Sequence, residues 1–183
     1  EYDRLPVNLV DGDQRGEAYR RLNPQGLVPM LEAGEASLTQ SLAIVEWIDA
    51  TYPSPPLLPR DTLLRAHVRA MALAVACDIH PLNNLRVLQY LKHELGHEQE
   101  EVDRWYRHWI ALGFAGLEAL AERHGGEFLS GDAPGLADIC LVPQMYNARR
   151  FDTPLEDYPL LVGYDAKANA LDAFADAHPD KNK

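Results

Sequence analysis

Leu27-Val28-Pro29 is the first of four short motifs whose chemistry suits ligand binding. A proline within a strand removes a donor from the hydrogen-bond ladder, so it belongs at a sheet edge, at a bulge or in a cis turn. A cis bond between Val28 and Pro29 would turn the N–H and C=O of Val28 outward, where an extended peptide could pair with them. The alternative is an ordinary proline on an edge strand.

Thr39-Gln40-Ser41 is the second motif, at the start of an expected helix. The Ser41 hydroxyl, the unpaired amides of the first turn and the positive end of the helix dipole together suit a carboxylate. The alternative is a serine that only caps the helix. A carboxylate site directly after a peptide-binding edge would fit a short anionic peptide.

The third motif is Asp78–Arg86, in which a proline interrupts a helical pattern. Pro81 lacks an N–H and disfavours helical geometry at His80. The kink leaves free backbone groups beside His80, Asn84 and Arg86, and in a regular helix His80 and Asn84 would share a face. The alternative is a core histidine whose ring is satisfied by the aspartate that begins the motif.

Asn147–Phe151 is the fourth motif, at the end of a long apolar run. The guanidinium groups of Arg149 and Arg150 could bind a carboxylate with two parallel hydrogen bonds at the mouth of a pocket. The alternative is that arginines in a last turn only offset the negative end of the helix dipole.

No motif supplies a nucleophile or a metal site. Cys77 and Cys140 lie in apolar helical runs, where cysteines are usually buried packing groups. The sequence contains no metal-ligand spacing, nucleophile elbow or phosphate-binding loop. We therefore expect no metal, and we expect any nucleophile to come from a ligand.

The composition argues against several classes of protein. The 183-residue chain has 17 Lys and Arg against 28 Asp and Glu, a formal net charge of −11 that disfavours nucleic acid and anionic membrane as partners. No apolar run approaches the roughly 20 residues that span a bilayer. Two cysteines cannot form a disulfide framework, which indicates reduced thiols in a cytoplasmic protein.

The elements that carry these motifs fall into two regions, separated by the proline-rich stretch 53–60. Before this stretch the periodicity predicts an edge strand at Arg4–Leu9, a helix at Glu17–Leu22, a hairpin of Leu27–Leu31 with Ala36–Leu38, and a helix from Ser41 to Tyr52. After it we expect helical stretches at Leu63–Lys92 (interrupted at Pro81), at Val102–Leu120 (ended by Gly125-Gly126), at Leu136–Met145 (buried) and at Tyr158–Ala175.

Four segments, three of which contain or extend the motifs above, resemble a known family. The segments Asn23–Pro29, Thr39–Glu46, Asp78–Arg86 and Ala137–Gln144 closely resemble the zeta class of glutathione transferases, and more narrowly its maleylacetoacetate and maleylpyruvate isomerases. The similarity covers essentially the whole chain in order. It implies an α/β thioredoxin-like domain at residues 1–52, a linker at 53–60 and an all-α domain at 61–183, in a homodimer.

The resemblance also implies a set of site residues, with glutathione as cofactor. The Val28 backbone, before a cis bond to Pro29, would hold the cysteinyl part, and Gln40 and Ser41 the γ-glutamyl end. The full set implied for glutathione is Gln14, Val28, Pro29, Gln40, Ser41, His80, Asn84 and Arg86, and for substrate carboxylates Arg86 and Arg150. Asp138 matches the acidic end of a buried capping box, where Gly135 replaces the usual serine or threonine.

The family begins with a strand and a helix that carry a Ser-Ser-x-x-x-Arg-Val-Arg type motif, which stabilises the glutathione thiolate. The chain starts at Glu1, in what resembles the second strand, and lacks that motif, so no catalytic residue is assigned. Because loss of that strand and helix would expose an apolar sheet, we expect a preceding segment in the complete protein.

The activity implied by the resemblance is cis–trans isomerisation of maleylacetoacetate or maleylpyruvate in tyrosine or aromatic breakdown. A thiolate adds to the activated double bond, the new single bond rotates, and the sulfur is expelled. The substrate would be a small anionic dicarbonyl acid. Two alternatives stay open: a glutathione transferase that acts on small α-halo acids, and a glutathione-transferase-like binding protein without turnover.

Overall fold

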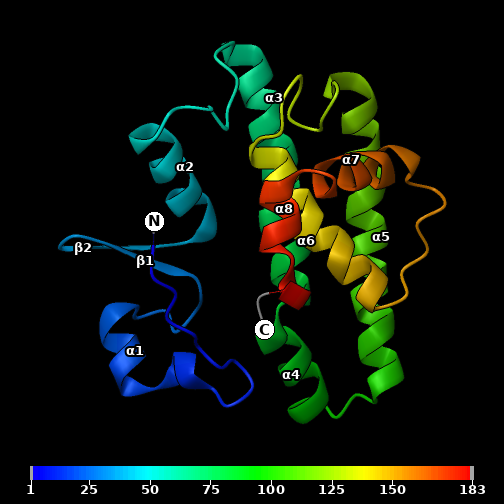
Figure 1. The fold of residues 1–183 in the computed structure, drawn as a ribbon. Helices are drawn as coiled ribbons and strands as arrows, with labels where there is room; N and C mark the ends of the chain where they lie inside the picture. The colour runs from blue at the N-terminus through cyan, green and yellow to red at the C-terminus, as the bar shows by residue number, and fades with distance from the viewer. Residues whose placement is uncertain (1, 182–183) are drawn as a thin grey trace. The chain divides into compact units, whose positions relative to one another are not determined.

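The computed structural model describes residues 2–181 and divides the chain into two compact units, Glu1–Pro55 and Pro56–Lys183. Figure 1 shows the succession of elements along the chain. Among the described residues, no helix is both long enough and apolar enough to cross a bilayer.

The first unit is built from two helices and one hairpin. Its elements are a 3₁₀ turn at Asp13–Arg15, helix α1 (Glu17–Leu22), strands β1 (Met30–Ala33) and β2 (Ala36–Thr39), and helix α2 (Ser41–Thr51). The predicted helices are confirmed. The hairpin is also confirmed, although its first strand begins at Met30, because Pro29 has no N–H to add to the ladder. Gly34, with φ 63°, makes the tight turn between the strands.

The predicted strand at Arg4–Leu9 is wrong. Residues 2–8 have neither helix nor strand, and Leu5 is 77% exposed. A strand exists only where a partner completes its ladder, and the sheet of the described residues contains β1 and β2 alone. The segment is instead held by a polar turn, in which the Asn8 backbone N–H donates to Asp13 Oδ2 at 3.0 Å.

In the described part of the second unit, the regular elements are all helices, with one isolated β-bridge between Phe128 and Gly131. Its α-helices are α3 (Thr62–Leu73), α4 (Leu85–His93), α5 (Gln99–His124), α6 (Leu136–Arg150), α7 (Pro159–Asn169) and α8 (Asp172–Ala177). Helix α6 packs against α3 and α7, and α5 packs against the same two helices (Figure 1). The expected burial of α6 is confirmed, because it is apolar on nearly every side. The core includes Val68, Met71, Ile110, Phe114, Leu117, Leu141, Met145 and Leu161.

The expected interruption at Pro81 is confirmed, and it begins earlier than the proline. After α3 the chain forms a π-helical turn at Ala74–Ile79 and then a 3₁₀ turn at His80–Asn83. Ile79 is fully buried against α5, where a Cβ on Gly113 would lie 2.2 Å from its Cγ1 atom. The absence of a side chain at Gly113 therefore lets α5 approach this turn closely.

The start of α6 depends on a buried carboxylate. Asp138 accepts hydrogen bonds from the backbone N–H groups of Leu129 (2.9 Å), Ser130 (3.1 Å) and Gly135 (3.0 Å). The Ser130 hydroxyl accepts from the Ala137 N–H at 3.0 Å, the role that an N-cap side chain usually has. Ser130 thus caps the helix in place of residue 135.

The predicted last helix, Tyr158–Ala175, is split in two. Helix α7 ends at Asn169, and Leu171 is extended (φ −87°, ψ 136°) before α8 begins. The Asn169 side chain donates to the backbone oxygen of Asp165 at 2.9 Å, and such local bonds compete with helix continuation. The apolar periodicity continues through this break, which is why the sequence did not indicate it.

Candidate functional site

The predicted cis bond between Val28 and Pro29 is confirmed. Val28 is 41% exposed, and its N–H and C=O make no hydrogen bond to another residue within 2–181. Two side chains fix the preceding peptide: Tyr19 Oη and Asn23 Nδ2 both donate to the Leu27 carbonyl, at 2.8 and 2.6 Å. The unit thus holds an open peptide edge in a fixed place.

Gln40, not Ser41, is the N-cap of α2, so the reading of Ser41 as a helix cap is wrong. Gln40 has φ 71°, a conformation that residues other than glycine rarely adopt and that often marks functional sites. Its Nε2 donates to Gln25 Oε1 at 2.8 Å. The Gln40 side chain makes no cap hydrogen bond, and no described residue is seen to take its place, so the first amides of α2 and the Ser41 hydroxyl are available to an anion.

Gln14 is buried in the 3₁₀ turn before α1, and its Oε1 atom has no hydrogen-bond partner within the described part of the chain. Its backbone oxygen lies close to Gly26, where a Cβ would approach it to 3.0 Å. A buried acceptor without a donor costs free energy, so a ligand amide would relieve it.

His80 and Asn84 do not share a helical face, contrary to the sequence argument. His80 starts the 3₁₀ turn, whereas Asn84 is extended (ψ 145°) and caps α4 by accepting the Arg86 N–H at 3.2 Å. His80 is exposed, and no hydrogen bond joins it to Asp78 in the described residues, so the alternative of a core histidine satisfied by Asp78 is wrong. Partial desolvation lowers the pKa of the His80 ring.

The two arginines at the end of α6 differ in their partners. Arg149 forms an ion pair with the buried Asp165, with Nη2 2.7 Å from Oδ2. Arg150 is exposed, and no described carboxylate pairs with it; its guanidinium lies 5.7 Å from the centroid of the Phe151 ring. Arg86, also exposed, has no ion pair with a described residue either. Arg86 and Arg150 can therefore accept an external anion.

Tyr106 and Phe151 adjoin Arg150, and the sequence did not indicate them. Their rings are stacked, with centroids 3.6 Å apart and planes 10° from parallel. Burial raises the pKa of Tyr106 to about 12, although the nearby charge of Arg150 opposes the shift. Phe151 directly follows Arg150 in the sequence and belongs to the fourth motif, but its ring was given no role. Tyr106 lies on α5, and no local sequence pattern links it to Phe151.

The helix end that carries Arg150 is closed by the backbone. Asp152 has φ 51°, and the Thr153 N–H donates to the Ala148 carbonyl at 2.9 Å. This left-handed turn satisfies carbonyls that the last turn of a helix leaves free. Arg107 Nη1 also donates to the Phe151 carbonyl, at 3.4 Å. The segment after α6 is thus tied to both α6 and α5.

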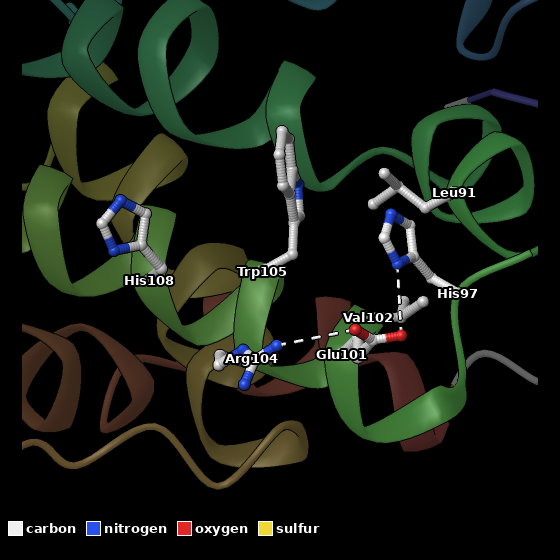
Figure 2. Close-up of a pocket in the computed structure, with 7 residues that line it drawn as sticks. All are labelled: Leu91, His97, Glu101, Val102, Arg104, Trp105 and His108. Atoms are coloured by element: carbon white, nitrogen blue, oxygen red, sulfur yellow. Dashed lines mark hydrogen bonds and ion pairs between the residues drawn. The ribbon is translucent and has the colours of Figure 1, made fainter. Parts of the chain in front are cut away.

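A separate pocket of about 340 Å³ lies between the end of α4 and the first half of α5 (Figure 2). It contains none of the predicted site residues. The lining residues are Leu91, His97, Glu101, Val102, Arg104, Trp105 and His108. The Trp105 indole is fixed by its Nε1–H, which donates to the Leu82 carbonyl at 2.8 Å.

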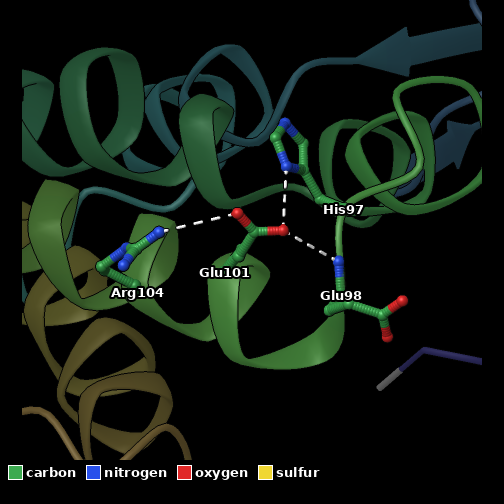
Figure 3. Close-up of polar contacts among 4 residues, drawn as sticks. All are labelled: His97, Glu98, Glu101 and Arg104. Carbon is green, nitrogen blue, oxygen red and sulfur yellow. Dashed lines mark hydrogen bonds and ion pairs between the residues drawn. The ribbon is translucent and has the colours of Figure 1, made fainter.

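Several polar groups of this pocket stabilise the start of α5 (Figure 3). Glu101 Oε2 accepts the Glu98 backbone N–H at 3.1 Å and lies 3.2 Å from His97 Nδ1, while Oε1 lies 3.7 Å from Arg104 Nη2. The Glu98 amide, and then the His97 ring, lower the pKa of the Glu101 carboxyl. Because Glu101 is engaged in a capping box, we assign these groups a structural role.

The two cysteines have different surroundings. Cys140 is half-buried, and burial with a contribution from the nearby Cys77 raises its pKa to about 11. Cys77 is exposed, so the expectation that it is a buried packing group is wrong. Cys77 lies in the π-helical turn at Ala74–Ile79, where the periodicity of a regular α-helix does not apply. Within residues 2–181, no three potential ligands are placed to hold a metal ion.

Comparisons with known proteins extend the resemblance. The family model for the glutathione S-transferase N-terminal domain matches residues 1–56. A probable maleylacetoacetate isomerase of Vibrio cholerae is 51% identical over 98% of this chain and 84% of its own length.

Two solved structures share the fold. One is the holo structure of a maleylpyruvate isomerase described as a bacterial zeta-class glutathione S-transferase: TM-score 0.93, 45% identity, 96% of this chain and 84% of that one. The other is a maleylacetoacetate isomerase of Methylobacterium extorquens AM1 with bound malonate and GSH: TM-score 0.95, 35% identity, 99% and 86% coverage.

Proposed function

Since the chain belongs to the zeta-class glutathione transferases of the maleylacetoacetate and maleylpyruvate isomerase type, we propose that it is a glutathione-dependent cis–trans isomerase of one or both of these maleyl acids. Its fold is that of the family, a thioredoxin-like N-terminal domain followed by helices. Glutathione is the cofactor. The reaction belongs to the degradation of tyrosine or other aromatic compounds.

One observation carries the glutathione assignment. The Val28 backbone, which pairs with none of the residues 2–181, and the start of α2, which Gln40 does not cap through its side chain, occur in the same unit, and each matches a part of the tripeptide. We assign the cysteinyl backbone to Val28, beside Pro29, and the γ-glutamyl end to Gln40, Ser41 and the first amides of α2. The unsatisfied Gln14 oxygen would accept a hydrogen bond from the same ligand.

The helical domain supplies the remaining groups in this proposal. We propose His80, Asn84 and Arg86 as further glutathione-binding residues, and Arg86 and Arg150 as the residues that bind the carboxylates of a small dicarbonyl acid. Both arginines lack a described carboxylate partner, so their charge is available to the substrate. We assign residues 1–52 to the thioredoxin-like glutathione-binding domain, 53–60 to the linker and 61–183 to the all-helical domain.

Bound glutathione supplies a thiolate that adds reversibly to the activated double bond, which permits rotation before the sulfur leaves. The chain orients the two reactants and offsets charge. Cationic groups near the dicarbonyl system stabilise the negative charge that develops on oxygen. Arg86 and Arg150 are the candidates for this role, and we assign no catalytic residue to the thiolate itself.

The proposal predicts that Arg150→Ala raises the KM for maleylpyruvate or maleylacetoacetate by about tenfold or more, because a charge-assisted contact is lost. The KM for glutathione should stay within about twofold. Steady-state kinetics of isomerisation, with each reactant varied in turn, measure both values. Unchanged KM for the acid would remove Arg150 from the site.

Arg149→Ala is the matched control, one residue away. It leaves the buried Asp165 without its cation, so it should lower the free energy of unfolding by about 1–2 kcal/mol with no change in the KM for the acid. We expect less than the full cost of breaking a buried pair, since Arg149 is half-exposed.

Turnover of chloroacetate, but of neither maleyl acid, would favour the alternative that the chain is a glutathione transferase acting on small α-halo acids.

We also propose a cytoplasmic homodimer. The free state of Cys77 and Cys140 agrees with a reducing compartment. Light scattering of the purified protein should give about twice the mass of one chain, and a monomeric mass would contradict the proposal.

A further inference from the structure

We propose that Phe151 and Tyr106 are positioning residues that orient the Arg150 guanidinium toward a substrate carboxylate. The inference rests on the proposed role of Arg150 and adds the means by which the chain holds this side chain. Neither aromatic residue needs to touch the substrate or glutathione.

The first argument is that Arg150 has no other described means of orientation. Its neighbour Arg149 is fixed by the 2.7 Å ion pair to Asp165. An exposed arginine without such a pair samples many rotamers, and ordering it on binding costs free energy. The face of Phe151, 5.7 Å from the guanidinium carbon, lies within the range of a cation–π contact and limits that freedom.

The second argument is that the Phe151 ring is itself held. Tyr106 is buried and stacks on it at 3.6 Å. Asn83 Nδ2 donates to the Tyr106 carbonyl at 3.3 Å, and Arg107 Nη1 donates to the Phe151 carbonyl at 3.4 Å. The stack therefore connects Arg150 to a buried part of α5, and a rigid support is what a positioned charge requires.

The third argument concerns charge. A tyrosinate at residue 106 would compete with the substrate for the Arg150 cation. A phenol is already protonated near neutral pH, and burial raises the pKa of Tyr106 further, to about 12, so the stack carries no anion at the pH of the assay. The positive charge of Arg150 remains available to an external carboxylate.

The test is Phe151→Leu, which keeps an apolar side chain but removes the ring face. We expect the KM for the maleyl acid to rise about three- to tenfold, with kcat and the KM for glutathione within about twofold. Phe151→Tyr keeps the ring face and should retain the wild-type KM for the maleyl acid. A wild-type KM in Phe151→Leu would overturn the inference.

Phe128→Leu is a matched control elsewhere in the helical unit. Lys167 Nζ lies 5.7 Å from the Phe128 ring centroid, the same separation as in the Arg150 pair. This variant should lower the melting temperature, because Phe128 is buried, and leave the KM for the acid unchanged. An equal rise in KM in both variants would indicate general destabilisation and overturn the inference.

A double-mutant cycle tests whether Phe151 acts through Arg150. In an Arg150→Ala background, Phe151→Leu should cause no further rise in KM, because nothing remains to be positioned. The same fold-change in both backgrounds would mean that Phe151 acts independently, and would contradict the inference.

Calorimetric titration of malonate, a small dicarboxylate, separates this inference from the proposed function, because it requires no turnover. The inference predicts that Phe151→Leu weakens malonate binding about three- to tenfold. If the wild type isomerises neither acid, but Phe151→Leu still binds malonate about three- to tenfold more weakly than the wild type, the proposed function fails and the inference stands. If the wild type isomerises an acid and Phe151→Leu binds malonate normally, only the inference fails. Equal malonate affinity in wild type and Arg150→Ala would remove Arg150 from the carboxylate site and overturn the inference, whatever the outcome of the turnover assay.

Discussion

At the scale of single residues, the surroundings decide what a side chain can do. Cys77 and Cys140 both occur in apolar runs, yet one thiol is exposed and the other is half-buried with a pKa raised to about 11. The thiolate is the reactive form, and at pH 8 a group with this pKa is ionised to roughly one part in a thousand. The two thiols should therefore differ in reactivity.

We predict that iodoacetamide at pH 8 alkylates Cys77 at least about tenfold faster than Cys140. Peptide mass spectrometry over a time course measures the two rates. Cys77→Ser should leave a single slow site and retain turnover, since the proposed nucleophile belongs to glutathione. Equal rates for the two cysteines would contradict the burial assigned to Cys140.

At the scale of elements, the cap of α6 shows how one position depends on another. Gly135 replaces the serine or threonine that the resemblance leads one to expect, and Ser130 supplies the capping hydroxyl instead. A Cβ at residue 135 would lie 2.4 Å from the Leu57 carbonyl oxygen and 3.0 Å from the Ser130 Cβ. The familiar serine does not fit this version of the cap.

We predict that Gly135→Ser destabilises the protein by about 1–3 kcal/mol, because the backbone oxygen of Leu57 must move. Ser130→Ala should cost about 1 kcal/mol through loss of the cap. Urea unfolding followed by circular dichroism gives both values. Higher stability in Gly135→Ser would show that the close approach to Leu57 is relieved at no cost.

Periodicity predicted those elements whose boundaries are set locally. The helices at Glu17–Leu22 and Ser41–Thr51 agree with their patterns, because each is followed within two residues by a proline, Pro24 or Pro53, that a helix cannot continue through. The strand at Arg4–Leu9 failed, since strand formation depends on a partner elsewhere in the chain. The break at Leu171 was hidden by an apolar pattern that continues through it.

The candidate site was predictable to a similar extent. The cis bond before Pro29 followed from a proline next to a strand and from the family resemblance. Gln40 as the N-cap of α2, and Ser130 as the cap of α6, could not be foreseen, because both depend on backbone conformation or distant packing. The stack of Tyr106 on Phe151 joins residues from separate elements, which no local spacing encodes.

At the scale of the whole molecule, protonation links histidines to stability. Partial desolvation lowers the pKa of His80, and desolvation followed by the charges of His67 and Arg123 lowers that of His124. The His124 and His67 rings are stacked, with centroids 3.6 Å apart. An unfolded histidine titrates near 6.5, so below this value the unfolded chain binds more protons than the folded one.

We therefore predict that stability is retained above about pH 6.5 and falls as the pH drops from there toward 5. Urea midpoints at several pH values measure the trend. The pKa of the Glu101 carboxyl is lowered, so its ionised form stabilises the folded state throughout this window. That stabilisation is lost only at lower pH, where the carboxyl becomes protonated. His124→Gln should flatten the pH dependence; a variant as steep as the wild type would exclude His124 as a cause.

The close approach of α5 to Ile79 also determines where the chain tolerates change. At Gly116 an added methyl group would meet no atom within 4 Å, so a substitution by alanine there creates no steric clash. Three residues earlier, at Gly113, the same methyl group would collide with Ile79, the immediate neighbour of His80. Two glycines on α5 thus differ in their tolerance of substitution. A side chain at Gly113 would displace Ile79 and, through it, the neighbouring site residue His80.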